Sequence, residues 1–228
     1  MRRTILVGFA TGLVLLALSA AIGARAGIVS IPFERPDGVG SWLASRAAGI
    51  AAYLAITLEI VFGLFLSTGA GDRWLARARS IEIHRFLSVA ALSLVATHAL
   101  ALLADRFVRF DILAVLVPFV APYRPFAVGI GAIAAYAVLV VHASFGLRRE
   151  IGQRAWRALH HLSFVVFVLA TAHGLLAGSD AQKPWLRAAY ASSTAAVLAL
   201  VVYRVVELRR ARSVPRGPSA HSIPRSSS

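Results

Sequence analysis

The chain has 228 residues, 58% of them hydrophobic, and a mean hydropathy of +0.73, which is typical of an integral membrane protein and not of a soluble domain. The formal net charge of +14 does not indicate a nucleic-acid partner, because the basic residues lie mainly in short segments between apolar runs. The chain has no cysteine, which excludes disulfides, iron–sulfur clusters and thiolate-bound metals within it.

Six hydrophobic stretches predict an all-α integral membrane bundle of six transmembrane helices. They cover residues 4–24, 42–67, 83–104, 125–147, 158–177 and 185–206. The first stretch has a second interpretation, because Met-Arg-Arg, the apolar run and Ala24-Arg25-Ala26 resemble a secretory signal peptide with its cleavage site. The run is longer than a usual signal core, which favours a retained span.

Charge in the connections predicts the orientation in the membrane. Arginine is concentrated before the first span, in the second-to-third and fourth-to-fifth connections, and after the sixth span. Because cytoplasmic loops collect Lys and Arg, we expect a multi-pass protein of the inner (plasma) membrane with both termini in the cytoplasm. The long connection at 105–124 has an apolar part, 112–120, that is too short to cross, so we expect it to lie in the outer interface or dip back in.

Two pairs of histidines lie in the third and fifth spans. His84 and His98 are 14 residues apart, and His160 and His173 are 13 apart. At 1.5 Å per residue each pair extends about 20 Å along its helix, or about two thirds of the ~30 Å hydrocarbon core. A buried imidazole needs a partner, and haem iron suits all four. Both spans run outward, so depth alone predicts that His84 pairs with His160 and His98 with His173.

Helical periodicity supports this arrangement for the third span only. Fourteen residues at about 100° each bring His98 to within about 40° of His84, whereas thirteen leave His173 about 140° from His160. The fifth span must therefore rotate, bend or bulge for both of its imidazoles to face one partner helix.

The residues around the histidines resemble the ferric-reductase-like transmembrane family, which includes ferric reductases and the membrane part of NADPH oxidases. The stretch from His84-Arg85-Phe86-Leu87 to Thr97-His98 is similar to the first ligand helix of that family, and the stretch from Trp156 to Gly174 to the second. Shorter segments resemble small bacterial members, namely Arg46-Ala47-Ala48-Gly49, Pro118-Phe119 and Tyr123-Arg124-Pro125. The likeness covers roughly residues 40–180.

The resemblance implies that His84, His98, His160 and His173 are the axial ligands of two b-type haems. Two imidazoles fill both axial positions, so such a haem transfers electrons at its edge and carries out no bond chemistry at iron. The implied protein is a transmembrane electron-transfer cytochrome b that carries electrons from the cytoplasmic side or the quinol pool to an external acceptor. Ferric iron is one such acceptor, and a partner oxidoreductase is another, as for the haem subunit of periplasmic methionine sulfoxide reductase.

Hydropathy, composition and the resemblance together predict three parts. We expect residues 1–39 to form the first span and an outer loop, 40–210 the ferric-reductase-like haem-binding domain, and 211–228 a disordered basic tail. The chain contains no Gly-x-Gly-x-x-Gly unit. We therefore expect an oxidoreductase subunit without a flavin or NADPH domain of its own, supplied by a flavoprotein with FMN or FAD, or by a quinol. The alternative is a haem-free membrane anchor or assembly subunit, or a small proton-coupled transporter.

Five further polar residues have two interpretations each. Arg46 and Arg85 are placed to bind haem propionates, or else they anchor the helix ends. Glu59 is a candidate for proton uptake or quinone contact, or stays protonated and bonds to a neighbouring helix. His142 is a candidate ligand at the depth of the inner haem or a polar packing residue, and His161 is a neighbour of His160 or its replacement.

Overall fold

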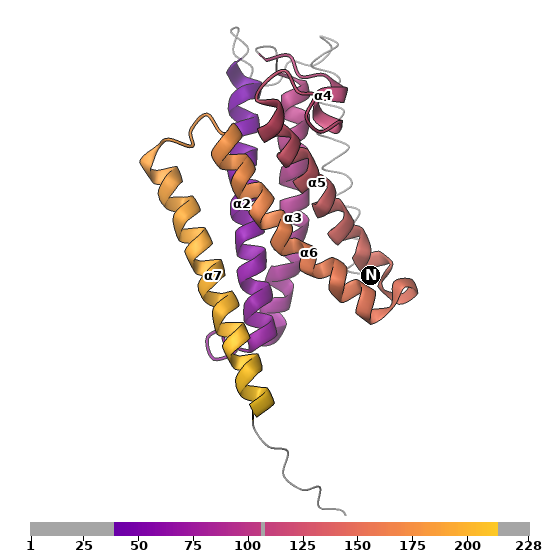
Figure 1. Ribbon diagram of the computed structural model, residues 1–228, viewed down its shortest axis with the longest axis vertical. Coiled ribbons are helices and arrows are strands. Elements are labelled where there is room, and N and C mark those ends of the chain that lie inside the picture. Colours follow the sequence, from indigo (N-terminus) through magenta and orange to yellow (C-terminus); the bar gives the residue numbers. More distant parts are fainter. Residues whose placement is uncertain (1–38, 106–107, 214–228) are drawn as a thin grey trace, which may run out of the picture.

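The computed structural model describes residues 39–105 and 108–213, so the predicted first span and the tail from residue 214 lie outside the described residues. The described chain folds into helices α2 (Val39–Thr68), α3 (Arg77–Leu103), α4 (Ile112–Leu116), α5 (Pro125–Gly146), α6 (Arg148–Ala177) and α7 (Pro184–Ser213) (Figure 1). All except α4 are long and apolar enough to cross a membrane. The prediction of an all-helical multi-pass membrane protein is therefore confirmed for five of the six spans.

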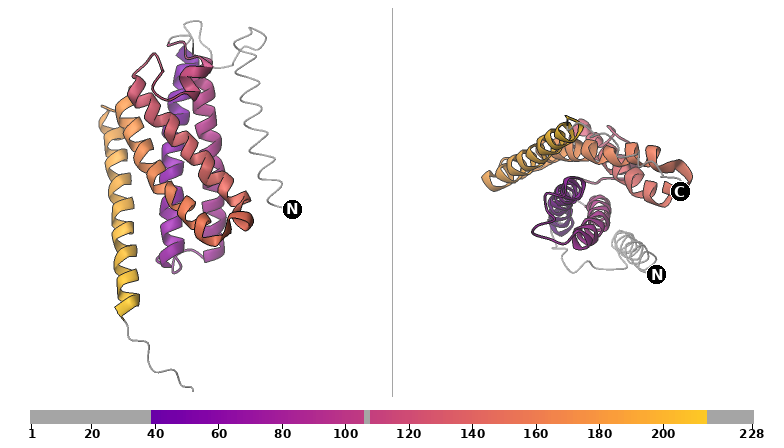
Figure 2. Two further views of the ribbon diagram at one scale, coloured as in Figure 1. Left: turned by 45° about the vertical axis from the view of Figure 1, so that its right-hand side comes forward. Right: turned by 90° about the horizontal axis from the view of Figure 1, so that it is seen from below.

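Two helical hairpins make up most of the molecule. α2 packs against α3, and α5 packs against α6, while α7 lies along α2. Figure 2 shows α2 and α3 as one pair, with α5, α6 and α7 arranged as a layer beside it. α3 and α6 are not closely packed against each other. The core between the two layers is formed by Tyr53, Ile56, Ala91, Phe167 and Leu186, with further apolar neighbours.

Two helices begin well before the apolar stretches that predicted them. α3 begins at Arg77 rather than near residue 83, and α6 begins at Arg148 rather than near residue 158. Hydropathy marks where the chain enters the membrane, but arginine, glutamate and glutamine are good helix formers, so the helix extends into the charged segment. Gly152 interrupts the first part of α6 with φ 79° and ψ 164°, a conformation that is open essentially to glycine alone.

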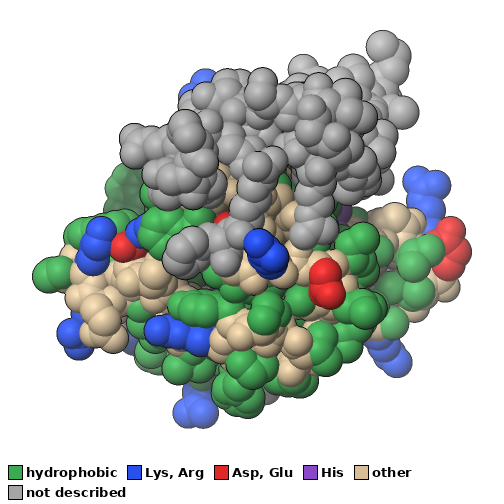
Figure 3. All heavy atoms as spheres, turned by 90° about the horizontal axis from the view of Figure 1, so that it is seen from above, with side chains coloured by type: hydrophobic (Ala, Val, Ile, Leu, Met, Phe, Trp, Pro, Cys, Tyr) green, Lys and Arg blue, Asp and Glu red, His purple; other side chains and the backbone are tan. Residues whose placement is uncertain are grey.

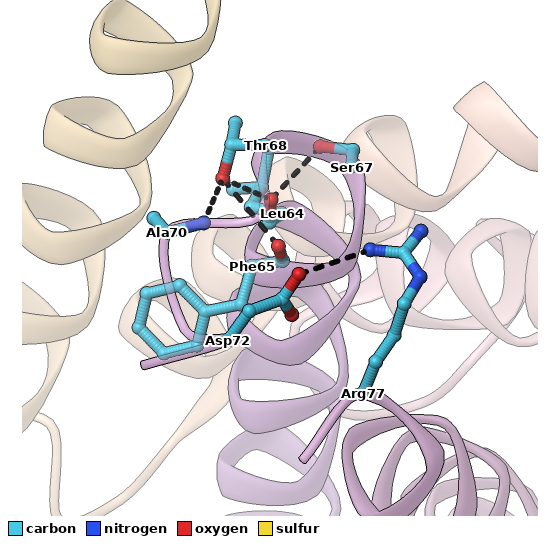
Figure 4. Close-up of polar contacts among 7 residues, drawn as sticks. All are labelled: Leu64, Phe65, Ser67, Thr68, Ala70, Asp72 and Arg77. Atoms are coloured by element: carbon cyan, nitrogen blue, oxygen red, sulfur yellow. Dashed lines mark hydrogen bonds and ion pairs between the residues drawn. The ribbon is translucent and has the colours of Figure 1, made fainter. Parts of the chain in front are cut away.

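The connection between α2 and α3 is a tight, capped turn (Figure 4). The hydroxyls of Ser67 and Thr68 both donate to the carbonyl of Leu64 at 2.9 Å, which satisfies a carbonyl at the end of α2. Gly69 follows with φ +70°, the left-handed conformation that commonly ends a helix. Asp72 then pairs with Arg77 at 3.6 Å at the start of α3. This turn returns α3 antiparallel to α2.

The long connection between α3 and α5 forms a cap at one end of the bundle. Its only helix in the described residues is α4, whose first turn is capped by Asp111 through a 2.6 Å bond from the Ala114 amide. Phe110, Ala114 and Ala121 are buried and form a small apolar cluster within this connection. Ile112 is more than half exposed, and Figure 3 shows hydrophobic side chains and both kinds of charge on the described part of this end. With 5 residues, α4 is too short to cross a membrane, in agreement with the short apolar length of this connection.

Candidate functional site

The four intramembrane histidines meet in two pairs between α3 and α6. The ring centroids of His84 and His160 are 6.2 Å apart with planes at 81°, and those of His98 and His173 are 6.1 Å apart with planes at 76°. Two imidazoles that bind one metal ion from opposite sides, each through a bond of about 2 Å, have their centroids about 6 Å apart. The rings therefore pair in space as depth predicted, at a separation that suits a metal between them.

The oblique course of α6 explains how both of its histidines reach α3. Periodicity predicted a rotation, bend or bulge, but no residue between His160 and His173 is non-helical, and Gly152 lies before both. In Figures 1 and 2, α6 runs obliquely across α2 and α3. When one helix crosses another at an angle, the side that faces the partner changes along its length. The crossing therefore compensates for the angular offset that an ideal parallel helix would have.

Hydrogen bonds from Nδ1 to backbone carbonyls hold three of the four rings. The pairs are His98 with Ser45 at 2.7 Å, His84 with Glu59 at 2.9 Å, and His173 with Ala127 at 2.8 Å. A carbonyl oxygen only accepts, so Nδ1 carries the hydrogen and Nε2 keeps its lone pair. Metal-binding histidines are commonly oriented in this way, which leaves Nε2 to bind the metal.

A glycine lies beneath each of the three anchored rings. A Cβ atom added at Gly49 would lie 2.9 Å from the His98 ring, one at Gly63 would lie 3.4 Å from the His84 ring, and one at Gly131 would lie 2.5 Å from the His173 ring. Each glycine is four residues after the residue whose carbonyl accepts the hydrogen bond. The missing side chain lets the imidazole come close to the helix backbone and reach that carbonyl.

The two hairpins repeat this arrangement, although the sequence shows no evident repeat. Ser45 and Gly49 of α2 correspond to Ala127 and Gly131 of α5, on which the His98 and His173 rings are anchored. Because His160 and His173 are 13 residues apart, Glu59 and Gly63 of α2 correspond to Val140 and Ser144 of α5, so a serine followed by Phe145 stands where the other three positions have glycine.

A large cavity opens beside the His98–His173 pair. Its volume is about 460 Å³, and the two imidazoles, Gly49 and Gly131 line it together with mainly apolar side chains. Phe110 of the connection between α3 and α5 also lines it. Cavities of several hundred Å³ with apolar walls and few polar groups are typical of sites for organic cofactors.

The cavity, the paired rings and their anchors together suit a flat metal-containing cofactor. No family model, curated protein or solved structure matches this chain. The resemblance to the ferric-reductase-like family therefore stays a prediction, and the geometry of the site is the evidence on function.

Arg46 and Arg85, the two arginines predicted to bind propionates, differ in their surroundings. Arg46 lines the large cavity, forms an ion pair with Asp180 and lies 4.0 Å from the centroid of the Trp42 ring. Lys183 also contacts Asp180, at 3.0 Å. Arg85 follows His84 directly and is exposed. Arg46 is thus next to a candidate cofactor cavity, and Arg85 is at the molecular surface.

The remaining polar candidates lie nearer the His84–His160 pair. His161 is exposed, and its Nδ1 lies 2.6 Å from the carbonyl of Arg157 in its own helix, so His160 is the histidine that faces His84. His142 is 3.3 Å from the Ser88 hydroxyl. Both line a cavity of about 30 Å³ together with Glu59, which makes a small polar cluster inside the bundle.

Sequence reasoning missed the glycines, the backbone acceptors and Asp180. One signal was present, because Gly49 and Gly63 are 14 residues apart, the same spacing as His84 and His98. Helices rise by the same amount per residue, so two antiparallel helices with the same spacing between glycines and between histidines can place Gly49 under His98 and Gly63 under His84. No comparable signal marked Asp180, which lies in a connection between helices.

Proposed function

We propose that this chain is a transmembrane electron-transfer cytochrome b that holds two bis-histidine haems. It carries electrons from the cytoplasmic side or the quinol pool to an external acceptor, either ferric iron or a partner oxidoreductase. The proposal rests on the two imidazole pairs at different depths. In each pair the ring centroids are 6.1–6.2 Å apart, the separation expected for two imidazoles that bind one metal ion from opposite sides. The resemblance to the ferric-reductase-like family supports the same function.

The number of ligands at each site favours haem over a bare metal ion. Each site offers two imidazoles, and no cluster of three or more His, Cys, Asp or Glu side chains that could hold a metal ion occurs in the described residues. A bare ion usually takes four or more ligands. Haem would bring nitrogen ligands of its own, so the two histidines at each site would be enough to hold it.

The residues around the sites fit the electrostatic needs of this cofactor. When bound, haem supplies reversible one-electron chemistry at iron. The anchored Nδ1 hydrogens keep His84, His98 and His173 in the tautomer that binds through Nε2. The walls of the large cavity are mainly apolar, and Arg46, which also lines it, would offer a cation to an anionic propionate. Arg85 has the same expected role near the His84–His160 pair.

The separation of the pairs suits transfer across the bilayer. His84 and His98 lie about 20 Å apart along α3, as their spacing requires. Two haems at these depths would lie near opposite surfaces of the membrane. His84 and His160 would hold the haem that takes electrons from a donor flavoprotein or a quinol, and His98 and His173 would hold the one that passes them to the external acceptor.

The alternative functions rest on the polar cluster near the His84–His160 pair. Glu59, Ser88 and His142 line a small cavity inside the bundle, and buried ionisable residues in membranes often serve proton movement. A proton-coupled transporter, or a haem-free anchor or assembly subunit, would use the same helices without a cofactor. Haem content separates these alternatives from the cytochrome.

The test is a reduced-minus-oxidised spectrum of the purified full chain, with haem stoichiometry. We expect two haems per chain and a low-spin bis-imidazole spectrum. His98→Ala should remove one haem and block electron transfer across the membrane. The matched control is His161→Ala, an exposed histidine next to a predicted ligand, which should keep both haems. A full haem complement in His98→Ala, or a colourless native protein, would refute the proposal.

A further inference from the structure

His160 is held differently from the other three histidines. Its buried Nδ1 has no hydrogen-bond partner in the described part of the chain, whereas the other three rings reach a backbone carbonyl. By the 13-residue spacing of His160 and His173, the corresponding acceptor would be the carbonyl of Val140. The fourth anchor of the repeat is therefore missing.

Phe145 and Trp156 explain why this anchor is missing. Ser144 stands at the position of the three glycines, and the ring centroid of the following residue, Phe145, lies 5.6 Å from that of His160 with the planes at 84°. Trp156 stacks on the same imidazole, with centroids 5.2 Å apart and planes at 14°, and its ring also contacts that of Phe145 at 5.6 Å. A phenyl ring beside the imidazole keeps it from the close approach to the backbone that glycine allows. His160 is thus positioned by aromatic packing, with no hydrogen bond to Nδ1.

The missing hydrogen bond makes His160 the weakest of the four ligands. A bond from Nδ1 to an acceptor fixes the tautomer and raises the basicity of the opposite nitrogen, and its loss commonly lowers metal affinity by about 10- to 100-fold. The His98–His173 pair has such a bond on both rings, whereas the His84–His160 pair has it on one.

Building on the proposed function, we infer that His160 is the one exchangeable ligand. The His84–His160 site then opens a coordination position to a small neutral ligand of ferrous haem, and the His98–His173 site stays closed. This gives the chain a ligand-binding site at one haem in addition to two electron-transfer centres.

Carbon monoxide is the probe, because it binds ferrous haem only where a coordination position opens. The full chain is loaded to two haems, reduced and titrated with carbon monoxide, and the visible spectrum is followed. We expect half of the haem to bind carbon monoxide. The double variant His98→Ala/His173→Ala should retain a haem that binds carbon monoxide, whereas the haem left in His84→Ala/His160→Ala should not.

A glycine substitution should open the His98–His173 site to carbon monoxide without removing a histidine ligand. In Gly131→Ala the added Cβ would lie 2.5 Å from Nδ1 of His173 and push the ring from the Ala127 carbonyl. We expect the carbon monoxide-binding fraction to rise from one half towards the whole. Gly146→Ala is the matched control, because it makes the same change in the same helix with no atom within 4 Å of the new Cβ. Its fraction should stay at one half.

The outcomes distinguish this inference from the proposal beneath it. Two bound haems that both resist carbon monoxide, or that both bind it in the native chain, overturn the role of His160 and leave the cytochrome intact. Equal carbon monoxide-binding fractions in Gly131→Ala and Gly146→Ala also overturn the role of His160. If the double variants do not fold, this comparison is the test of the inference. A chain that takes up no haem overturns both.

Discussion

At the scale of single residues, the absence of a side chain is as important as the presence of an imidazole. Gly49, Gly63 and Gly131 each lie beneath a histidine ring that reaches a carbonyl one turn earlier in the same helix as the glycine. Glycine weakens a helix by roughly 1 kcal/mol relative to alanine. Its use at these positions is explained by the close approach of the ring to the backbone.

Alanine substitutions at four glycines should therefore have graded effects. The nearest ring atom to an added Cβ lies at 2.5 Å for Gly131, 2.9 Å for Gly49 and 3.4 Å for Gly63, and nothing lies within 4 Å for Gly146. We expect Gly131→Ala to destabilise the fold most, by about 1–3 kcal/mol through overpacking. Gly146→Ala should be neutral or stabilising by up to about 1 kcal/mol.

The measurement is the thermal unfolding midpoint of each variant in one detergent, together with its haem content. An order of midpoints unrelated to these distances would show that the glycines serve some purpose other than ring approach.

At the scale of the helix, α6 combines a charged beginning with an apolar remainder. Gly152 separates the first few residues from the straight part that carries both histidines. Its φ of 79° and ψ of 164° lie in a region that other residues avoid. The break lets the chain turn sharply out of α5, which ends at Gly146, before α6 crosses the bundle.

Gly152→Ala tests this break directly. A side chain in this conformation costs about 1–3 kcal/mol, although no atom lies within 4 Å of the added Cβ. We expect a lower unfolding midpoint than for Gly146→Ala, which has equal free space and no strained backbone. Equal unfolding midpoints in the two variants would mean that the fold does not require the glycine conformation at residue 152.

At the scale of the whole molecule, α2 packs against α6 and α7, whereas α3 and α6 face each other through the histidine pairs. α3 and α6 provide the rings but are not closely packed against each other. The ion pair between Arg46 of α2 and Asp180 of the α6–α7 connection ties the layers at one end. A ligand bridging α3 and α6 would therefore hold the two hairpins together.

Removal of haem should accordingly destabilise the whole bundle. Ligand binding to the folded state alone adds about 4 kcal/mol when free ligand is 1,000 times its dissociation constant. We expect a higher unfolding midpoint for the haem-loaded chain than for the haem-depleted chain, measured by circular dichroism in the same detergent. The gain should shrink in His98→Ala/His173→Ala, which lacks one site. Identical midpoints with and without haem would argue against a bridging cofactor.

Much of this arrangement could be predicted from local properties of the chain. The described spans, the short connection that does not cross, and the order of the histidines in depth depend on hydropathy and on a constant rise per residue. Hydropathy and rise per residue are both properties of a single helix, so they can be calculated from the sequence without knowing how helices pack. The pairing of His84 with His160 and of His98 with His173 was accessible for this reason, whereas the ligand role of these residues stays a prediction.

The rotation and crossing of the helices required the tertiary structure. Periodicity placed His160 and His173 on different sides of an ideal helix, and only the oblique path of α6 across α3 brings both rings to their partners. The anchoring carbonyls, the glycines beneath the rings and the missing anchor at His160 likewise depend on which helix faces which. These contacts join residues that are far apart in sequence. They depend on how the helices pack against each other, which the properties of a single helix do not determine.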